Sequence, residues 1–288
     1  MTANSNPSLH VLGQAQAHVG NNGLRKISDI IGSQFVSVLT LITYLFLFVP
    51  IIILIIYSFN SGHSMATWKG FTFGWYGELF HNRYIFMALK NSLIVAVSSA
   101  SISTILGTLA ALVLVRQKFK GKQIFSTLML SPLVLPEIVL GVAFLVFLVF
   151  LKISLSYFTL IMGHILLTLP FATLIMRTSV AGLDVSLEEA AADLGANEIR
   201  IFRYVTFPLL MPGITAAFLL TFTVSLDDFV ISMFVAGVGN TTLPLQIFSM
   251  LKLGITPEIN ALGTVLILLN LVLILTIGGQ QLRRVMGG

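Results

Sequence analysis

Long uncharged stretches dominate the chain. Six apolar runs follow one another and are separated by short polar segments that carry most of the Lys and Arg. They cover residues 30–67 (with an apolar centre at 35–59), 91–115, 124–150, 153–176, 209–235 and 260–282. Each run is longer than the ~20 residues that an α-helix needs to cross the hydrocarbon core of a bilayer. The pattern predicts an all-α integral membrane protein with six transmembrane helices, since a membrane β-barrel would alternate apolar and polar residues.

Composition excludes several other classes of protein. Of the 288 residues, 56% are hydrophobic and only 9% are charged, whereas an average soluble domain has roughly 25% charged residues. So few charges cannot cover the surface of a water-soluble enzyme, and such high hydrophobicity excludes disorder. The chain contains no Cys, which excludes disulfides, thiolate metal sites and cysteine nucleophiles. We expect no metal site and no catalytic residues.

The basic residues between the apolar runs predict the orientation of the helices. If the N-terminus is cytoplasmic, six crossings return the C-terminus to the cytoplasm, with eleven Lys and Arg inside and five outside. The inside group is Arg25, Lys26, Arg116, Lys118, Lys120, Lys122, Arg177, Arg200, Arg203, Arg283 and Arg284, and the outside group is Lys69, Arg83, Lys90, Lys152 and Lys252. Cytoplasmic segments are enriched in these residues, which favours this orientation.

Three parts follow from this pattern. Polar residues 1–34 are expected to be a flexible cytoplasmic tail, residues 35–284 the transmembrane domain, and residues 285–288 a C-terminal tail. The outer segment 68–90 mixes aromatic and charged residues, which predicts a helix along the membrane interface. Its anchors would be Trp68, Trp75 and Tyr76.

The longest predicted cytoplasmic connection covers residues 177–206. Ser186 and Glu189 have the spacing of a capping box, which predicts a helix beginning at Leu187. Gly195 can end that helix in a left-handed conformation, and Asn197 can cap a second, amphipathic helix.

After this second helix, Pro208 is expected to end the loop and to open the fifth span. The small Ala residues of the loop permit a close backbone approach, which suits docking into a groove of a partner protein. The alternative is a helix pair that only covers the cytoplasmic end of the bundle.

The loop also resembles the signature loop of the permease subunits of ATP-driven importers. That signature reads Glu-Ala-Ala, three residues, Gly, nine residues, Ile, one residue and Leu-Pro. The matching residues are Glu189, Ala190, Ala191, Gly195 and Pro208, while Val205 and Phe207 replace the usual Ile and Leu. The resemblance covers roughly residues 35–284 and implies the six-helix type I importer permease fold. It also implies that this segment, including Glu188, is a coupling helix that sits in a cleft of the ATP-hydrolysing subunit.

The chain has no G-x-x-x-x-G-K-[ST] phosphate loop. We therefore expect ATP and Mg²⁺ to bind to a separate ATPase, and no cofactor to bind to this chain. The resemblance implies a second, usually non-identical permease subunit, two ATPase subunits and an extracytoplasmic substrate-binding protein as partners, and no nucleic acid. It also implies a multi-pass protein of the bacterial inner membrane.

Three carboxylates, Glu137, Asp227 and Asp228, lie within predicted spans, where charged groups are costly and mark a functional hypothesis. At ~1.5 Å per residue, Glu137 would lie about 20 Å along the third span, and the aspartates about 24 to 26 Å along the fifth. All three could then share one layer, with Asp227 and Asp228 ~100° apart on their helix. Two prolines, at positions 132 and 136, predict a kinked helix just before Glu137, whose freed carbonyls could line a cavity. His164, in the fourth span, could pair with one of these acids or form a hydrogen bond to a neighbouring helix.

Two interpretations of the acids remain open: a layer that passes a cation, or structural groups held by hydrogen bonds. The segments IYSFNSG (56–62), LPEIVLGVAFL (135–145) and SLDDFVISMFVAGVGNTTLP (225–244) are similar to the second permease subunits of spermidine/putrescine importers. The resemblance implies import of a polyamine by alternating access, and carboxylates with aromatic rings attract such cations. The alternatives are a permease for another small cationic or organic solute, an ATP-independent secondary transporter, and an intramembrane hydrolase with paired aspartates.

Overall fold

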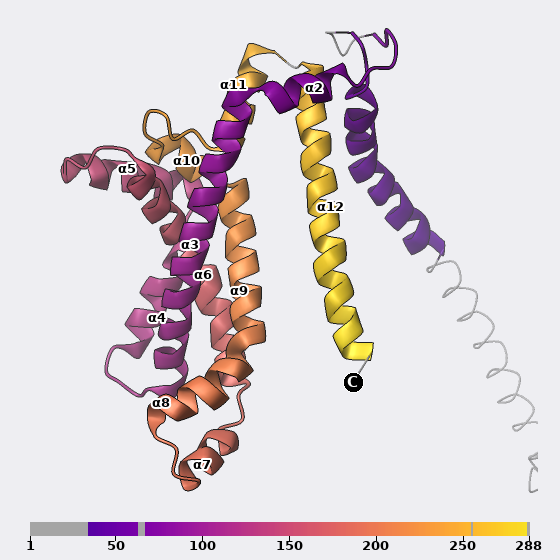
Figure 1. The fold of residues 1–288 in the computed structure, drawn as a ribbon. Coiled ribbons are helices and arrows are strands. Elements are labelled where there is room, and N and C mark those ends of the chain that lie inside the picture. The colour runs from indigo at the N-terminus through magenta and orange to yellow at the C-terminus, as the bar shows by residue number, and fades with distance from the viewer. Residues whose placement is uncertain (1–33, 63–66, 255, 287–288) are drawn as a thin grey trace, which may run out of the picture. The chain divides into compact units, whose positions relative to one another are not determined.

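The computed structural model describes residues 34–62, 67–254 and 256–286, and their regular structure is helical apart from one isolated bridge between Asn60 and Phe71 (Figure 1). The chain forms two compact units, one from the residues up to Trp75 together with Asn260 onward, and one from Tyr76 to Ile259. The predicted tail at residues 1–34, except Gln34, and residues 287–288 lie outside the described part.

The labelled elements follow one another closely along the chain. They are α2 (Gly74–His81), α3 (Arg83–Arg116), α4 (Lys122–Leu130), η1 (Ser131–Leu133), α5 (Glu137–Phe150), α6 (Tyr157–Ala181), α7 (Ser186–Asp193), α8 (Glu198–Ile201), η2 (Phe202–Thr206), α9 (Phe207–Asp227), α10 (Val230–Val235), α11 (Leu243–Leu253) and α12 (Pro257–Met286). A further helix, Gln34–Tyr57, precedes them.

Helices α3, α6 and α9 lie side by side and form the core of the larger unit (Figure 1). Small side chains allow this close approach: Ala111, Ala172 and Ala217 are fully buried around Met176. The hydroxyls of Ser103 and Thr168 form a hydrogen bond of 2.7 Å between α3 and α6. Small residues and interhelical hydroxyl bonds are typical of helix packing in membranes.

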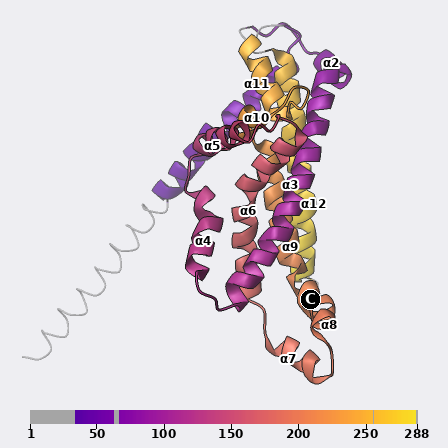
Figure 2. The same cartoon turned by 90° about the vertical axis from the view of Figure 1, so that its left-hand side faces the viewer.

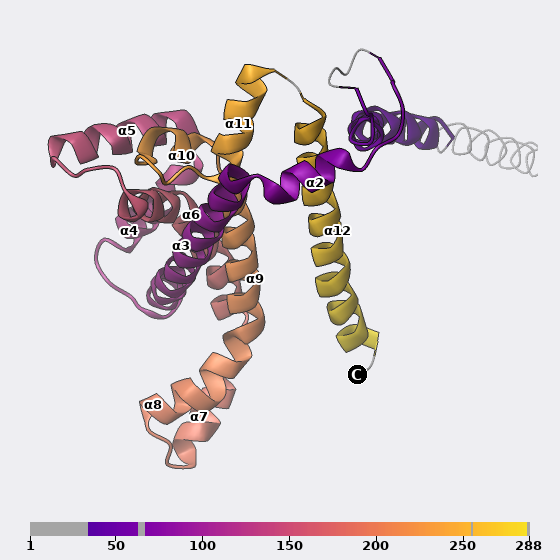
Figure 3. The same cartoon turned by 45° about the horizontal axis from the view of Figure 1, so that its top comes forward.

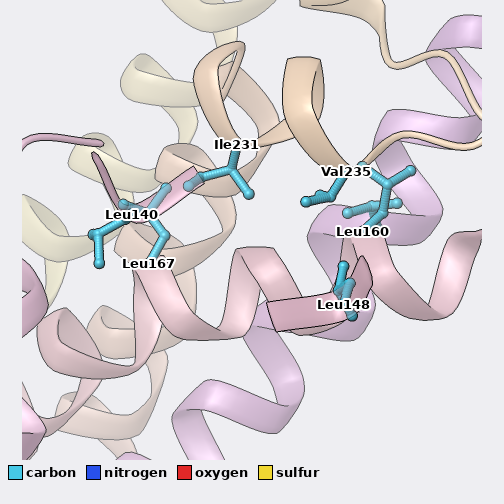
Figure 4. Packing of buried hydrophobic residues seen from close by; sticks show 7 residues of the cluster. Leu140, Leu148, Leu160, Leu167, Ile231 and Val235 are labelled. Atoms are coloured by element: carbon cyan, nitrogen blue, oxygen red, sulfur yellow. The ribbon is translucent and has the colours of Figure 1, made fainter. Parts of the chain in front are cut away.

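A second apolar cluster holds α5 and α10 against α6. It consists of Val95, Leu140, Leu148, Leu160, Leu167, Ile231 and Val235, most of which Figure 4 labels. Because Leu140 and Leu148 come from α5, and Ile231 and Val235 from α10, this cluster holds both helices along their length.

Four described helices are long and apolar enough to cross a membrane, and a fifth span results if the bent pair of Lys122–Leu133 and Glu137–Phe150 counts as one. The four are Gln34–Tyr57, Arg83–Arg116, Tyr157–Ala181 and Glu198–Asp227. The sixth predicted span coincides with α12, whose described apolar part is Pro257–Leu269. The prediction of an all-α protein with several membrane helices is confirmed.

The third predicted span, residues 124–150, is bent where the prolines before Glu137 predicted a kinked helix. Helices α4 and α5 are bent by 108° at a short break before Glu137 (Figure 2). Pro136 caps α5 at this break and disfavours a helical conformation in Leu135 before it. Glu137 is therefore the first residue of a helix, and a depth counted at a constant rise from residue 124 does not apply across a bend of 108°.

The predicted fifth span, residues 209–235, is also interrupted. Helix α9 ends at Asp227, and Asp228 has an extended backbone with ψ of 122° before α10 begins at Val230. The expected 100° separation of the two aspartates on one helix is therefore wrong, because Asp228 lies outside the helix.

In the smaller unit, Asn60 organises the turn that follows the helix Gln34–Tyr57. Its side chain is fully buried, donates to the Thr67 carbonyl at 2.9 Å and accepts from the Lys69 N–H at 2.9 Å. Trp75, predicted as an interfacial anchor, is buried, and its indole N–H donates to the Asn60 carbonyl at 2.7 Å. Trp75 is thus a structural link, whereas Trp68 remains exposed.

Candidate functional site

Helices α7 and α8 form a small helix pair that extends from the beginning of α9 (Figure 3). Gly195 has a φ of +83°, and its N–H bonds to the Ala192 carbonyl at 2.9 Å, so it ends α7 as predicted. The side chain of Asn197 accepts the N–H of Arg200 at 3.0 Å and caps α8, also as predicted.

The predicted capping box at Ser186 and Glu189 is wrong, because Asp184 caps α7. Its carboxylate accepts the N–H of Ser186 at 3.0 Å, and α7 begins at Ser186 rather than at Leu187. Hydrogen bonds from the hydroxyl and the N–H of Ser186 hold the pKa of Asp184 below its ordinary value of 3.8. The sequence pattern had assigned the capping oxygen to Ser186. In the structure Asp184, two residues earlier, supplies it.

The loop and the fifth span are one continuous helix, Glu198–Asp227, of 30 residues. The join is the π-helical segment η2, in which the N–H of Phe207 reaches the Phe202 carbonyl five residues back. The expectation that Pro208 ends the loop is therefore wrong. Pro208 lies near the start of α9, as predicted, and the helix continues through it after the π-helical segment.

Glu188, one of the predicted coupling residues, is bound to other parts of the same chain. The Arg116 guanidinium donates to both of its carboxylate oxygens, at 2.8 and 2.9 Å, and the Thr206 hydroxyl donates to Oε1. Partial burial acts to raise the pKa of Glu188, but the hydrogen bonds from Arg116 and Thr206 and the positive charge of Arg116 together lower it.

The other signature residues lie on the surface of the larger unit. Glu189, Ala190 and Gly195 are exposed, and Ala191 is half-buried. Two large apolar side chains accompany them, Leu194 at 89% exposure and Ile199 at 77%. This exposed group of Ala, Gly, Leu and Ile side chains has the size and chemistry to enter a groove of another protein.

The three membrane acids take different positions. Glu137 is the first residue of α5 and Asp227 the last residue of α9, and both are exposed, whereas Asp228 is buried. Glu137 lies close enough to Asp228 for their charges to interact. The breaks before α5 and before α10 therefore bring Glu137 and Asp228 together.

Asp228 is held by the fold itself. Its carboxylate oxygens accept the N–H groups of Ile231 at 3.1 Å and Ser232 at 2.9 Å, which caps α10. Oδ2 also lies 3.4 Å from Nε2 of His164, and both side chains are 1% exposed.

His164 satisfies both of the alternatives raised by the sequence. Besides its pairing with Asp228, its Nδ1 forms a hydrogen bond with Ser225 at 2.7 Å and its Nε2 with Ser232 at 3.0 Å. Ser225 in turn bonds to Ser99 of α3 at 2.9 Å. The network thus joins α3, α6, α9 and α10 behind the two exposed acids. In the described part of the chain, Glu137 and Asp227 form no ion pair.

Residues 103–285 match the family described as "Binding-protein-dependent transport system inner membrane component". The chain belongs to this family. It is 41% identical over 233 residues to the spermidine/putrescine transport system permease protein PotC of Haemophilus influenzae, covering 81% of this chain and 91% of the relative. It is 38% identical over 245 residues to the putrescine transport system permease protein PotI of Escherichia coli, covering 83% and 87%.

Solved structures show the same fold for this binding-protein-dependent permease. A chain of a bacterial ABC transporter involved in the import of the acidic polysaccharide alginate superposes with a TM-score of 0.68 at 18% identity, covering 88% of this chain and 97% of the other. A chain of an amino acid ABC transporter superposes with a TM-score of 0.55 at 15% identity, covering 73% and 98%. The predicted ABC importer permease fold is confirmed.

Several residues of the permease were missed by the sequence analysis. Arg116 was interpreted only as a topology signal, and nothing in the pattern paired it with Glu188, 72 positions away. Ser225 and Ser232 carried no signal of their own, although each lies within a few residues of Asp228. Long-range pairing of single polar residues depends on the packing of α3, α6 and α10, which periodicity does not specify.

Proposed function

We propose that this chain is a permease subunit of an ATP-binding-cassette importer that moves a polyamine across the bacterial inner membrane. It would work with a second, non-identical permease, with two ATPase subunits that bind ATP and Mg²⁺, and with an extracytoplasmic binding protein. Both termini would be cytoplasmic, and the chain would carry no ATPase site. The names of relatives at about 40% identity, putrescine and spermidine/putrescine permeases, support the choice of substrate.

The observation that carries the proposed mechanism is the unbroken helix Glu198–Asp227. Its first residues belong to the exposed loop with Glu189 and Gly195, and its last residue is Asp227. A helix of 30 residues is about 45 Å long. A displacement of the loop by the ATPase would thus be transmitted along one continuous helix to the acid at its far end.

The substrate would meet the two acids that the fold leaves exposed. Carboxylates at the ends of broken helices can attract protonated amines, and Glu137 and Asp227 both lie at such ends. Asp228 would act indirectly, because its oxygens already accept two backbone N–H groups and face His164. We therefore assign Glu137 and Asp227 to the substrate pathway, and Asp228 to the placement of Asp227.

Uptake of radiolabelled putrescine and spermidine by the complete transporter in proteoliposomes tests the substrate. Asp227→Asn and Glu137→Gln are expected to lower uptake at limiting polyamine concentration, because each removes a negative charge from the pathway. Glu78→Gln, at an exposed acid of α2, is the matched control and should leave uptake unchanged. Unchanged uptake in both pathway variants would exclude cation handling by these acids.

Coupling to ATP is tested separately. Gly195→Pro and Glu189→Arg are expected to abolish ATP-driven uptake while the complex still assembles, because they disturb the end of α7 and its exposed face. Normal uptake in both variants would contradict the docking role of the loop. Uptake that persists in vesicles without ATPase subunits would favour a secondary transporter instead.

A further inference from the structure

The side chain of Glu188 connects three segments of the larger unit. Arg116 is the last residue of α3, Glu188 lies in the first turn of α7, and Thr206 is the last residue of η2 before α9. Both N–H···O bonds from Arg116 are short, at 2.8 and 2.9 Å, and the Thr206 hydroxyl shares one of the two carboxylate oxygens.

These contacts are stronger than those of an ordinary surface ion pair. Exposed pairs contribute little, because water and mobile side chains weaken them. Here the guanidinium binds the carboxylate with two parallel hydrogen bonds, a geometry that is both strong and specific in direction. Thr206 is 2% exposed and the Glu188 side chain 17%, so neither is freely solvated, whereas water reaches the Arg116 side chain, which is 32% exposed.

Each charge also suits the helix end on which it lies. A positive charge is favourable near the C-terminus of a helix, where Arg116 ends α3. A negative charge is favourable near the N-terminus, where Glu188 lies in the first turn of α7. The pair therefore joins the C-terminus of α3 to the N-terminus of α7, and each charge is favourable at its own helix end.

We infer that Arg116, Glu188 and Thr206 form a clasp that transmits displacement of α7 to α3 as well as to α9. Arg116 is then a positioning residue for transport, because it holds the loop in a defined place against the bundle. The proposal rests on the proposed function, in which an ATPase moves α7. Helix α3 packs along both α6 and α9, so the clasp links the loop directly to the central packing of the larger unit.

Neighbouring residues separate the clasp from the docking surface. Glu188 points to Arg116 and Thr206 of its own chain, whereas the adjacent Glu189 is exposed. Glu188→Gln therefore removes one charge from the clasp, and Glu189→Gln removes one charge from the exposed surface. Glu189→Gln is a matched control for the geometry of the clasp.

The first test measures the distance between α3 and α7 in the complete transporter in lipid nanodiscs. The chain has no Cys, so spin labels can be attached at Lys118→Cys, two residues after the end of α3, and at Asp193→Cys, the last residue of α7, both exposed positions outside the clasp. Glu188→Gln and Arg116→Gln are expected to broaden the distance distribution, while Glu189→Gln leaves it as narrow as in the parent chain. An unchanged, narrow distribution in both clasp variants would overturn the proposal.

The second test is exchange of the charges. Arg116→Glu and Glu188→Arg should each lower the amount of substrate moved per ATP hydrolysed by about fivefold or more, the usual size of coupling between linked sites. The double variant restores an ion pair between the same helices and is expected to recover most of this loss and the narrow distance. A double variant no better than either single variant would overturn the clasp as a direct contact.

These results also separate the clasp from the proposed function. A broadened distance with unchanged substrate movement per ATP would overturn the role of Arg116 in positioning, while the ATP-driven mechanism would stand. Transport that continues without ATPase subunits would instead overturn the proposed function, and the label distances would still report on the clasp.

Discussion

At the scale of single residues, two adjacent aspartates perform different tasks. Asp227 ends α9 with an exposed side chain, whereas Asp228 is buried, caps α10 and pairs with His164. The difference arises because the helix stops between them, so that their side chains no longer follow one helical surface. An acid within a membrane helix is therefore a candidate for structure as well as for transport.

This difference predicts that substitution of Asp228 lowers thermal stability, whereas substitution of Asp227 lowers uptake. Asp228→Ala leaves two backbone N–H groups without their buried acceptor and removes one of the contacts of His164, and an unsatisfied buried polar group costs about 1–3 kcal/mol. We expect a clearly lower midpoint of thermal unfolding for the purified protein in detergent. Asp227→Ala should leave that midpoint almost unchanged and lower polyamine uptake. Equal midpoints for the two variants would contradict the structural role of Asp228.

Glu188 makes the clasp sensitive to acid in a defined direction. Its lowered pKa means that the folded protein favours the carboxylate, so its stabilisation is complete above the ordinary value of 4.5 and is lost as pH falls through the lower folded value. The α3–α7 label distance should thus stay narrow from neutral pH to 4.5 and broaden below it. In Glu188→Gln the distance should be broad throughout, and a parent chain that broadens near neutral pH would contradict this account.

At the scale of elements, one glycine sets the approach of α3 to α6. A Cβ added at Gly107 would lie 2.7 Å from Ala172 Cβ and 2.8 Å from the Thr173 backbone nitrogen, which is too close for either helix to yield locally. Gly107→Ala should therefore separate the helices and destabilise the fold by about 1–3 kcal/mol, as overpacking commonly does.

Gly77→Ala in α2 is the control for that substitution, because a Cβ there meets no atom within 4 Å. Ala favours a helix over Gly, so this variant should be neutral or slightly stabilising. The midpoint of thermal unfolding checks both variants. A loss of stability at position 77 as large as at position 107 would show that helix packing is not the cause.

The same scale shows how far the sequence could predict the structure. Apolar runs located the long helices, and Gly195 and Asn197 marked two ends of the loop helices, because these signals are local in the chain. A kink before Glu137 was predicted from its neighbouring prolines, but neither its angle of 108° nor the break at Asp228 was, since an uninterrupted apolar run describes a span whether it is straight or broken. The pairing of Arg116 with Glu188 depends on the packing of distant helices and had no local signal.

For the candidate site, the type of residue was more predictable than its environment. The membrane acids stood out by their cost in an apolar run, and His164 as a partner was one of two stated alternatives. Which acid is buried could not be predicted, because the answer depends on two N–H groups that become free only where α10 begins.

At the scale of the whole molecule, the charge pattern predicts a single orientation in the membrane. The chain has no Cys, so a thiol introduced by Glu78→Cys or Lys120→Cys can be labelled alone. In intact cells a membrane-impermeant maleimide should react at position 78 and not at position 120, while permeabilised cells should show reaction at both. Reaction only at position 120 in intact cells would reverse the orientation.

The π-helical segment η2 also determines the angle at which the loop leaves α9. Each residue of an α-helix advances the direction of its side chains by ~100°. Deleting one residue within Phe202–Thr206 would convert the π-helical turn to an α-helical one. The preceding helices α7 and α8 would then be rotated about the axis of α9. The five residues of this segment thus fix a rotational phase, and the ATPase would meet the correct face of α7 only while that phase is kept.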